Sequence, residues 1–221
     1  MKQTILKRVG VIALGALIVS SAQVMAQTAE NSATTHTHTH THTHKDDGPS
    51  LVDAAAVKAR NLSDWGGDWQ SLYPLLQDGT LDEVMEHKAE HGEKSAEEYR
   101  AYYEVGYKTD VERILIDGPS VTFFRDGQPV QGQYAEDGYE ILTYKSGNQG
   151  VRFIFEKSGG DAAAPRFIQF SDHKIAPTKA DHYHLYWGND RAELLTEVTN
   201  WPTYFPAQLN GAEIASEMMA H

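Results

Sequence analysis

Two patterns of hydrophobic and polar positions follow one another along the chain after its first 49 residues. Between Ser50 and Tyr107 apolar residues recur at the spacing of helices that bury one face. After Asp110 short apolar runs alternate with turn residues, which is typical of antiparallel strands. Helical spacing returns near the C-terminal end, where Asn210 can cap a last helix.

These patterns predict five helical segments: Leu51–Arg60, a segment from Asp68 through Leu76, a segment from Thr80 to His91, Ala96–Tyr107 and Ala212–Met219. Thr80 with Glu83 and Ser95 with Glu98 have the spacing of capping boxes. The expected strands are Val111–Ile116, Val121–Arg125, Val130–Tyr134, Tyr139–Tyr144, Val151–Glu156, Arg166–Phe170 and His182–Trp187. Gly-containing turns separate them. We therefore expect a mainly β protein with helices: an antiparallel barrel or sandwich, a helical N-terminal portion and a C-terminal helix.

The first 26 residues have the composition of an export signal. Lys2, Lys7 and Arg8 precede an apolar run over residues 9–19, and a small-residue cleavage site ends at Ala26. We predict a cleavable signal peptide over residues 1–26, and the run is too short for a membrane span. No cysteine follows it, so we expect no lipid or membrane anchor. The expected location is the bacterial periplasm.

Residues 27–49 are polar and contain an alternating Thr-His segment. Its five histidines are His36, His38, His40, His42 and His44. In an extended chain this spacing puts all five imidazoles on one side. We predict a disordered arm that captures metal ions weakly, because ordering the arm costs entropy. A polar linker in which the histidines are incidental is the alternative.

The composition limits the chemistry available to the protein. The sequence has eleven histidines and no cysteine, which excludes disulfides, iron–sulfur clusters, thiolate zinc fingers and cysteine nucleophiles. Acidic residues outnumber basic ones 31 to 19, giving a formal charge of −12. This charge argues against nucleic acid as a partner. Transition-metal chemistry would have to use imidazole and carboxylate.

Three histidines have a spacing that suits a metal site on a β-scaffold. His182 and His184 lie two apart on an expected strand, so both project from the same face. His173 follows the preceding strand, and an antiparallel arrangement can bring it close to the pair. Three imidazoles leave a fourth tetrahedral position on zinc for water or another ligand. An exposed polar strand face is the alternative. Asp172 and Asp181 flank the histidines and could orient an imidazole N–H.

The other histidines give weaker signals. His87 and His91 are four apart on an expected helix, but the metalloprotease pattern HExxH is absent. Four glutamates lie between positions 83 and 93, and a solvated acidic face is the favoured interpretation over a low-affinity secondary site. His221, the last residue, could supply a mobile additional ligand. We count it with the five arm histidines as accessory metal capture.

Several blocks of sequence, in this order, resemble the ZinT (YodA) family of bacterial periplasmic zinc- and cadmium-binding proteins. The blocks are Leu62–Trp65, Trp69–Leu76, Gly138–Gly147, Ile168–His173, His182–His184 and Asn200–Tyr204. The resemblance implies a lipocalin-like (calycin) barrel and a zinc site on His173, His182 and His184. It also implies production under zinc starvation and delivery of zinc to the periplasmic binding component of a high-affinity ABC importer. A His-rich segment after the signal peptide is a further feature of the family.

One departure from that family concerns stability. Members can carry two cysteines in the barrel hairpins, and this sequence has Gly132 and Lys157 at the corresponding places. The metal site is untouched by this difference. We expect bound zinc to contribute part of the stability that a disulfide would otherwise give.

The leading hypothesis is a single metal-binding domain over residues 50–221 that captures Zn²⁺, with Cd²⁺ and other divalent transition metals possible, and is not an enzyme. A zinc-dependent hydrolase or hydratase is the first alternative, since three histidines and a water are also a catalytic arrangement. It would need a general base, and the sequence offers no recognisable one. A lipocalin-like carrier of a small organic ligand, with Tyr134, Tyr144, Phe153 and Phe155 lining a cavity, is the second.

Overall fold

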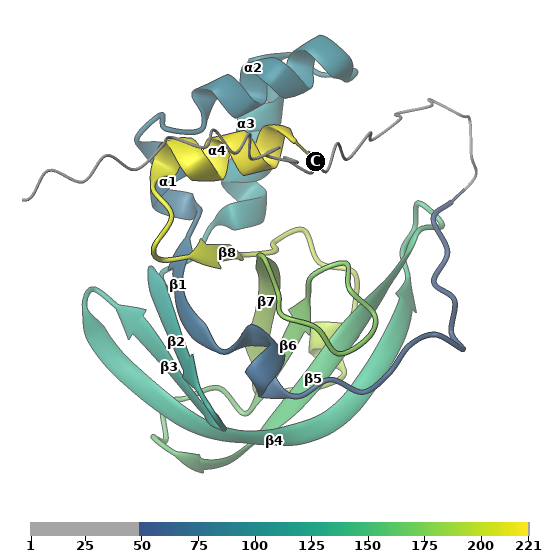
Figure 1. The fold of residues 1–221 in the computed structure, drawn as a ribbon, viewed down its shortest axis with the longest axis vertical. Helices are drawn as coiled ribbons and strands as arrows, with labels where there is room; N and C mark the ends of the chain where they lie inside the picture. Colours follow the sequence, from purple (N-terminus) through teal and green to yellow (C-terminus); the bar gives the residue numbers. More distant parts are fainter. Residues whose placement is uncertain (1–48, 221) are drawn as a thin grey trace, which may run out of the picture. The chain divides into compact units, whose positions relative to one another are not determined.

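In the computed structural model, which describes residues 49–220, each strand pairs with the next along the chain and the last pairs with the first. Eight antiparallel strands thereby close a barrel, and the α-helices gather at one end of it (Figure 1). The strands are β1 Gly67–Ser71, β2 Arg113–Asp117, β3 Ser120–Arg125, β4 Gln128–Thr143, β5 Gln149–Gly160, β6 Phe167–Ser171, β7 Tyr183–Gly188 and β8 Thr203–Pro206. The expected lipocalin-like antiparallel barrel with helices is confirmed.

The helices of the described residues lie mainly between β1 and β2 and after β8. They are η1 Leu62–Trp65, α1 Tyr73–Gln77, α2 Asp82–His91, α3 Ala96–Tyr107, η2 Glu193–Leu195 and α4 Gly211–Met219. The capping box of Ser95 and Glu98 is confirmed at α3, and Asn210 caps α4 together with Glu213. Within residues 49–220, no helix is long and apolar enough to cross a membrane.

Two predicted helices are wrong. Residues 51–60 make only a turn and otherwise run in extended form, with the Lys58 amide donating to the Ile175 carbonyl. The segment after Asp68 is strand β1, because its backbone is hydrogen-bonded to β2 on one side and β8 on the other. Its aromatic and leucine residues fit a helix by spacing, but Trp69 belongs to the barrel core and only residues 73–77 form a helix.

Three further predictions change in detail. α2 begins at Asp82 after Leu81 without a side-chain cap, so the expected Thr80–Glu83 capping box is wrong. The expected strands 130–134 and 139–144 are one continuous strand, β4, which bulges where a hairpin was expected at Gly138. Gly138 has a φ of 81°, a conformation that glycine adopts without strain. β8 was not predicted, because Pro202 directly precedes its four residues and Pro206 is the last of them.

Aromatic side chains fill the interior of the barrel. Trp65, at the end of η1, is fully buried and stacks on Phe170 with ring centroids 4.6 Å apart. Phe153 and Phe155 pack against the same indole ring, and Tyr134 is buried in the same core. The residues expected to line a carrier cavity are thus mostly core residues, as is common inside small barrels.

A second hydrophobic cluster joins the helices to the outer surface of the barrel. It consists of Phe205 of β8 together with Leu72, Leu76, Leu81, Val84, Met85, Tyr107, Ile214 and Ala215. Neighbouring strand residues alternate in direction, so Tyr204 points into the barrel core while Thr203 and Phe205 point toward the helices. The helical layer therefore covers the outer face of β8, next to β7.

A buried arginine fastens the long connection between β6 and β7. The guanidinium of Arg60 donates to Asp172 at 2.6 Å and to Asp64 at 2.9 Å, and the side chains of Arg60 and Asp172 are fully buried. It also donates to the carbonyls of Lys174 and Thr178 and lies 4.1 Å from the Trp65 ring centroid. One side chain thus ties the first half of the connection, from Asp172 to Thr178, to the barrel core.

The two positions where family members can carry cysteines lie on adjacent strands, Gly132 on β4 and Lys157 on β5. The Lys157 ammonium donates to the carbonyls of Asp161 and Ala164. The ring of Tyr134 occupies the space beside Gly132, and its hydroxyl donates to the Pro165 carbonyl at 2.7 Å. Hydrogen bonds therefore hold the β5–β6 loop in this region of the barrel.

Replacing Arg60 by Met should lower the free energy of unfolding by roughly 3–5 kcal/mol, because Asp172 would remain buried without its cation. Urea unfolding followed by tryptophan fluorescence measures the change. Arg166→Met is the matched control, since Arg166 pairs with Glu156 on the exposed surface and its loss should change stability little. Equal effects of the two substitutions would contradict the central role of Arg60.

Candidate metal centre

The structure brings the three sequence-predicted histidines together at the helical end of the barrel. His184 is on β7, His182 immediately precedes that strand, and His173 lies at the start of the connection that follows β6. Their ring centroids are 5.8 Å apart for His173 and His184, 6.2 Å for His173 and His182, and 6.4 Å for His182 and His184. The three rings form a nearly equilateral triangle.

Strand register decides that these histidines lie outside the barrel core. Tyr183 pairs with Tyr204 and both side chains are in the core, so His184, paired with Thr203, points to the outer face. That face is covered by the helical layer. The site therefore lies between the barrel wall and the helices.

Thr203 fixes the tautomer of His184. The hydroxyl of Thr203 donates its one proton to the Trp201 carbonyl at 2.9 Å, and the same oxygen lies 2.8 Å from Nδ1 of His184. The oxygen can therefore only accept at His184, so Nδ1 carries the ring proton and Nε2 presents its lone pair. A histidine that donates one N–H to a neighbour and keeps the other nitrogen free is prepared to bind a metal.

Phe205 and the backbone set the other two rings. The ring of His182 stacks on Phe205 with centroids 4.9 Å apart and planes 6° from parallel. His173 has a φ of 64°, a left-handed conformation that costs a non-glycine residue roughly 1–3 kcal/mol and persists only where its surroundings enforce it. Here the buried pair of Arg60 with the adjacent Asp172 supplies that restraint.

The protein environment keeps His184 neutral. Burial lowers the pKa of His184 to about 3, and the neighbouring His173, His182 and Arg152 add to the effect. A neutral imidazole is the form that binds metals, so this ring does not have to lose a proton near neutral pH.

The donor set and its dimensions fit a borderline divalent ion. Zn–N bonds of about 2.0–2.1 Å and tetrahedral angles place imidazole centroids about 5 Å apart, so the rings need to close by about 1 Å. Side-chain rotations of an exposed His173 are sufficient for such a movement. Three histidines leave a fourth position open on the metal.

A pocket of about 240 Å³ gives access to the three histidines. Its other described lining residues are Lys88, Tyr102, Tyr103, Tyr107, Trp201, Thr203, Phe205 and Met218. Burial raises the pKa of Tyr103 to about 12 and raises that of Tyr107 well above its ordinary value, so these phenols stay protonated. No carboxylate is among these described lining residues, so none of them is an evident general base.

The remaining candidates fall in different places. Asp172 pairs with Arg60, and Asp181 pairs with Lys174 at 2.7 Å; the orienting partner of His184 is Thr203. His36, His38, His40, His42, His44 and His221 lie outside the described residues, as does the predicted signal peptide. His87 and His91 lie on α2, outside the group formed by His173, His182 and His184, and Glu90 joins them there.

Sequence reasoning missed Thr203 and Phe205. Both follow Trp201-Pro202 in a segment for which no strand was predicted. Their role depends on the pairing of β8 with β7. Thr203 lies in one of the recognised sequence blocks, Asn200–Tyr204, and Phe205 follows that block directly, which is the signal that could have pointed to them.

A family model described as ZinT (YodA), periplasmic, lipocalin-like and concerned with zinc recruitment matches residues 43–221. The chain belongs to the ZinT family. This member is 62% identical over 166 residues to the probable metal-binding protein YrpE of Bacillus subtilis, covering 75% of the chain and 66% of YrpE. It is 51% identical over 169 residues to the zinc-binding lipoprotein AdcA of Streptococcus pneumoniae, covering 76% of the chain but only 34% of AdcA.

Solved structures agree with the ZinT fold. The crystal structure of the Zn(II)-bound ZinT-like domain of Streptococcus pneumoniae AdcA superposes with a TM-score of 0.73 at 49% identity. The match covers 76% of this chain and 94% of that domain. The chain thus corresponds to one domain of the longer AdcA protein.

The tautomer lock at His184 can be tested on this ZinT protein. Thr203→Val keeps the shape but removes the acceptor for Nδ1, so zinc affinity should fall by roughly 10- to 100-fold. Thr203→Ser retains the hydroxyl and should bind zinc nearly as well as the unchanged protein. Competition titration against a chromophoric chelator measures affinity, and ¹⁵N NMR of the imidazole reports the tautomer. Equal affinities of the two variants would contradict the lock.

Proposed function

We propose that this chain is an exported zinc-binding protein that captures Zn²⁺ as cargo on His173, His182 and His184 and passes it to a zinc importer. The observation that carries the proposal is the convergence of three imidazoles around one point, with His184 held in the tautomer that exposes Nε2. Membership of a family described by zinc recruitment, and similarity to a Zn(II)-bound domain, support zinc as the ion. Imidazole ligands accept Cd²⁺ and other divalent transition metals as well.

The open fourth position supports a role in transfer rather than permanent storage. Structural zinc sites are closed by four protein ligands, whereas an incoming ligand can enter a site that has three. The pocket reaches the surface beside α3, so a partner's side chain can approach the ion. We infer that the partner is the periplasmic zinc-binding component of an ABC importer. AdcA, a relative of this chain that is named a zinc-binding lipoprotein, has a ZinT-like domain within a longer chain. This arrangement supports the pairing.

The N-terminal segment completes the proposed route. A cleavable signal peptide over residues 1–26 would bring the chain to the periplasm, the location named in the family description. The histidines at positions 36 to 44 would raise the local concentration of ions by weak and rapidly exchanging binding. The histidine triad would then hold one ion.

The lining of the pocket favours binding over catalysis. A zinc hydrolase needs a general base beside the metal-bound water. The described residues around the three histidines are mostly aromatic, and burial raises the pKa values of two of them, Tyr103 and Tyr107. We therefore propose a non-catalytic role.

The proposed site predicts which histidines carry tight binding. The double variant His182→Ala, His184→Ala should lose tight zinc binding and retain only weak binding by the N-terminal histidines. Gln131→Ala with Gln133→Ala is a matched control, because it removes two polar side chains at the same spacing on another strand. Competition titration with a chromophoric chelator measures both. Unchanged affinity after loss of His182 and His184 would refute the assignment.

Removing zinc should also lower thermal stability. Zinc at a thousandfold excess over its dissociation constant stabilises the folded state by about 4 kcal/mol, because only the folded chain forms the site. For a domain of this size that corresponds to a rise of several degrees in Tm. Calorimetry with zinc and with chelator measures it. The His182→Ala, His184→Ala variant should show no such difference, and an unchanged midpoint in the original protein would contradict the prediction.

A further inference from the structure

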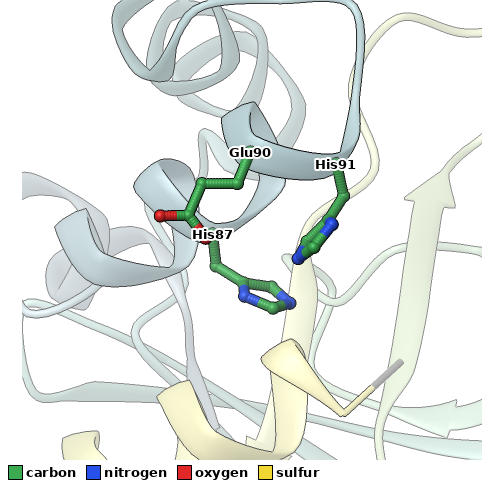
Figure 2. Close-up of side chains that lie close together, drawn as sticks. All are labelled: His87, Glu90 and His91. Carbon is green, nitrogen blue, oxygen red and sulfur yellow. The ribbon is translucent and has the colours of Figure 1, made fainter.

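The last turn of α2 carries a second group of metal-ligating side chains. His87, Glu90 and His91 each offer one ligand atom, and these atoms lie within 4.8 Å of one another. Figure 2 shows both imidazoles on the same side of the helix, with the Glu90 carboxylate beside His87. The two imidazole centroids are 4.7 Å apart. This spacing follows from the helix itself, since residues three and four apart are neighbours on its surface.

We propose that His87, Glu90 and His91 form a second, weaker site for a divalent transition-metal ion such as Zn²⁺. Two imidazole nitrogens and one carboxylate oxygen are a donor set that zinc accepts. Tetrahedral zinc needs its ligand atoms about 3.4 Å apart, a closure that the exposed Glu90 and His91 side chains can make by rotating. A three-ligand site open to solvent exchanges its ion quickly.

The electrostatics of this turn favour a cation. His91 is the last residue of α2, where the partial negative charge of the helix C-terminus is concentrated. Glu83 and Glu86 on the same helix, and Glu93 two residues beyond its end, add negative charge. The ammonium groups of the two nearby lysines lie over aromatic rings of α3. Nζ of Lys88 is 5.9 Å from the ring centroid of Tyr103, and Nζ of Lys94 is 5.8 Å from that of Tyr99.

The helix that presents the three ligands is held in place by packing. Val84 and Met85 of α2 are buried in the same cluster as Ile214 of α4. At the end of the helix, a β-carbon at Gly92 would collide with the hydroxyl of Tyr99, so the glycine leaves room for the Tyr99 ring of α3 to pack there. Ligands on a packed helix lose less entropy on binding than ligands on an extended arm.

The proposed site belongs to the same helical layer that covers the barrel histidines. Lys88, the neighbour of His87 in sequence, lines the pocket that leads to His173, His182 and His184. An ion released from α2 would therefore start close to the rim of that pocket. The inference goes beyond the proposed function because the α2 site needs none of the barrel histidines.

The test reads the two sites separately in one sample. Zn²⁺ is titrated into ¹⁵N-labelled, untagged protein, and the imidazole nitrogen signals of individual histidines are followed by NMR. The signals of His87 and His91 should shift together, at higher zinc concentrations than those of His173, His182 and His184. Absence of any zinc-dependent shift at His87 and His91 would overturn the proposal.

A matched pair of variants distinguishes coordination from a diffuse acidic surface. Glu90→Gln and Glu86→Gln remove the same charge from the same helix, but only Glu90 belongs to the ligand group. Glu90→Gln should move the His87 and His91 shifts to higher zinc concentrations, and Glu86→Gln should change them little. Equal effects would indicate general attraction of cations to the acidic face and would overturn the site.

Independence from the barrel site is the last arm of the experiment. In the variant His182→Ala, His184→Ala the zinc-dependent shifts of His87 and His91 should persist. Their loss in that variant would contradict a separate site. If the proposed function is wrong, the signals of His173, His182 and His184 in the unchanged protein should not shift with zinc. That result differs from the absence of shifts at His87 and His91, so the two outcomes can be told apart. Circular dichroism confirms that each variant keeps its helices.

Discussion

The buried ion pair between Arg60 and Asp172 is the interaction on which the geometry of the candidate metal centre depends. Burying two charges is costly unless they are paired and hydrogen-bonded, and here the guanidinium has two carboxylates, two carbonyls and the face of Trp65 as neighbours. Its partners in the β6–β7 connection are Asp172, Lys174 and Thr178. The connection is therefore fixed to the barrel core, although it contains no regular secondary structure.

This restraint acts on the candidate site because Asp172 and His173 are consecutive residues. Asp172 is fully committed to the core, and His173 next to it takes a left-handed backbone conformation that directs its side chain toward His182 and His184. The other two histidines are placed by different means, one by stacking on Phe205 and one by the hydrogen bond to Thr203. The barrel wall thus positions two of the proposed ligands, and the fastened β6–β7 connection positions the third.

The absence of cysteine shifts the stabilisation of the barrel to other interactions. At the positions where family members can carry cysteines, Lys157 and the hydroxyl of Tyr134 hold the β5–β6 loop by hydrogen bonds to its carbonyls. Two hydrophobic clusters, one inside the barrel and one between the barrel and the helices, supply the rest. The metal centre lies at the boundary of these two clusters, where α3 and β8 approach each other.

Residue type and spacing by themselves determined much of this protein. Short strands with glycine turns predicted an antiparallel barrel or sandwich, and the capping box of α3 and the Asn210 cap of α4 were predicted from residue type and spacing. A His-x-His pair with a third histidine nine positions earlier indicated the candidate site. These features are local, because a side chain's direction on a strand or helix follows from the backbone period. Strand β1, strand β8 and the partner of His184 were decided only by tertiary structure. The residues around Trp69 also fit a helix by their spacing, and the residues around Thr203 were not predicted to form a strand. In both segments, hydrogen bonds to strands distant in sequence select the strand conformation. The same pairing turns His184 out of the core and against Thr203, because register between strands fixes which face each side chain takes.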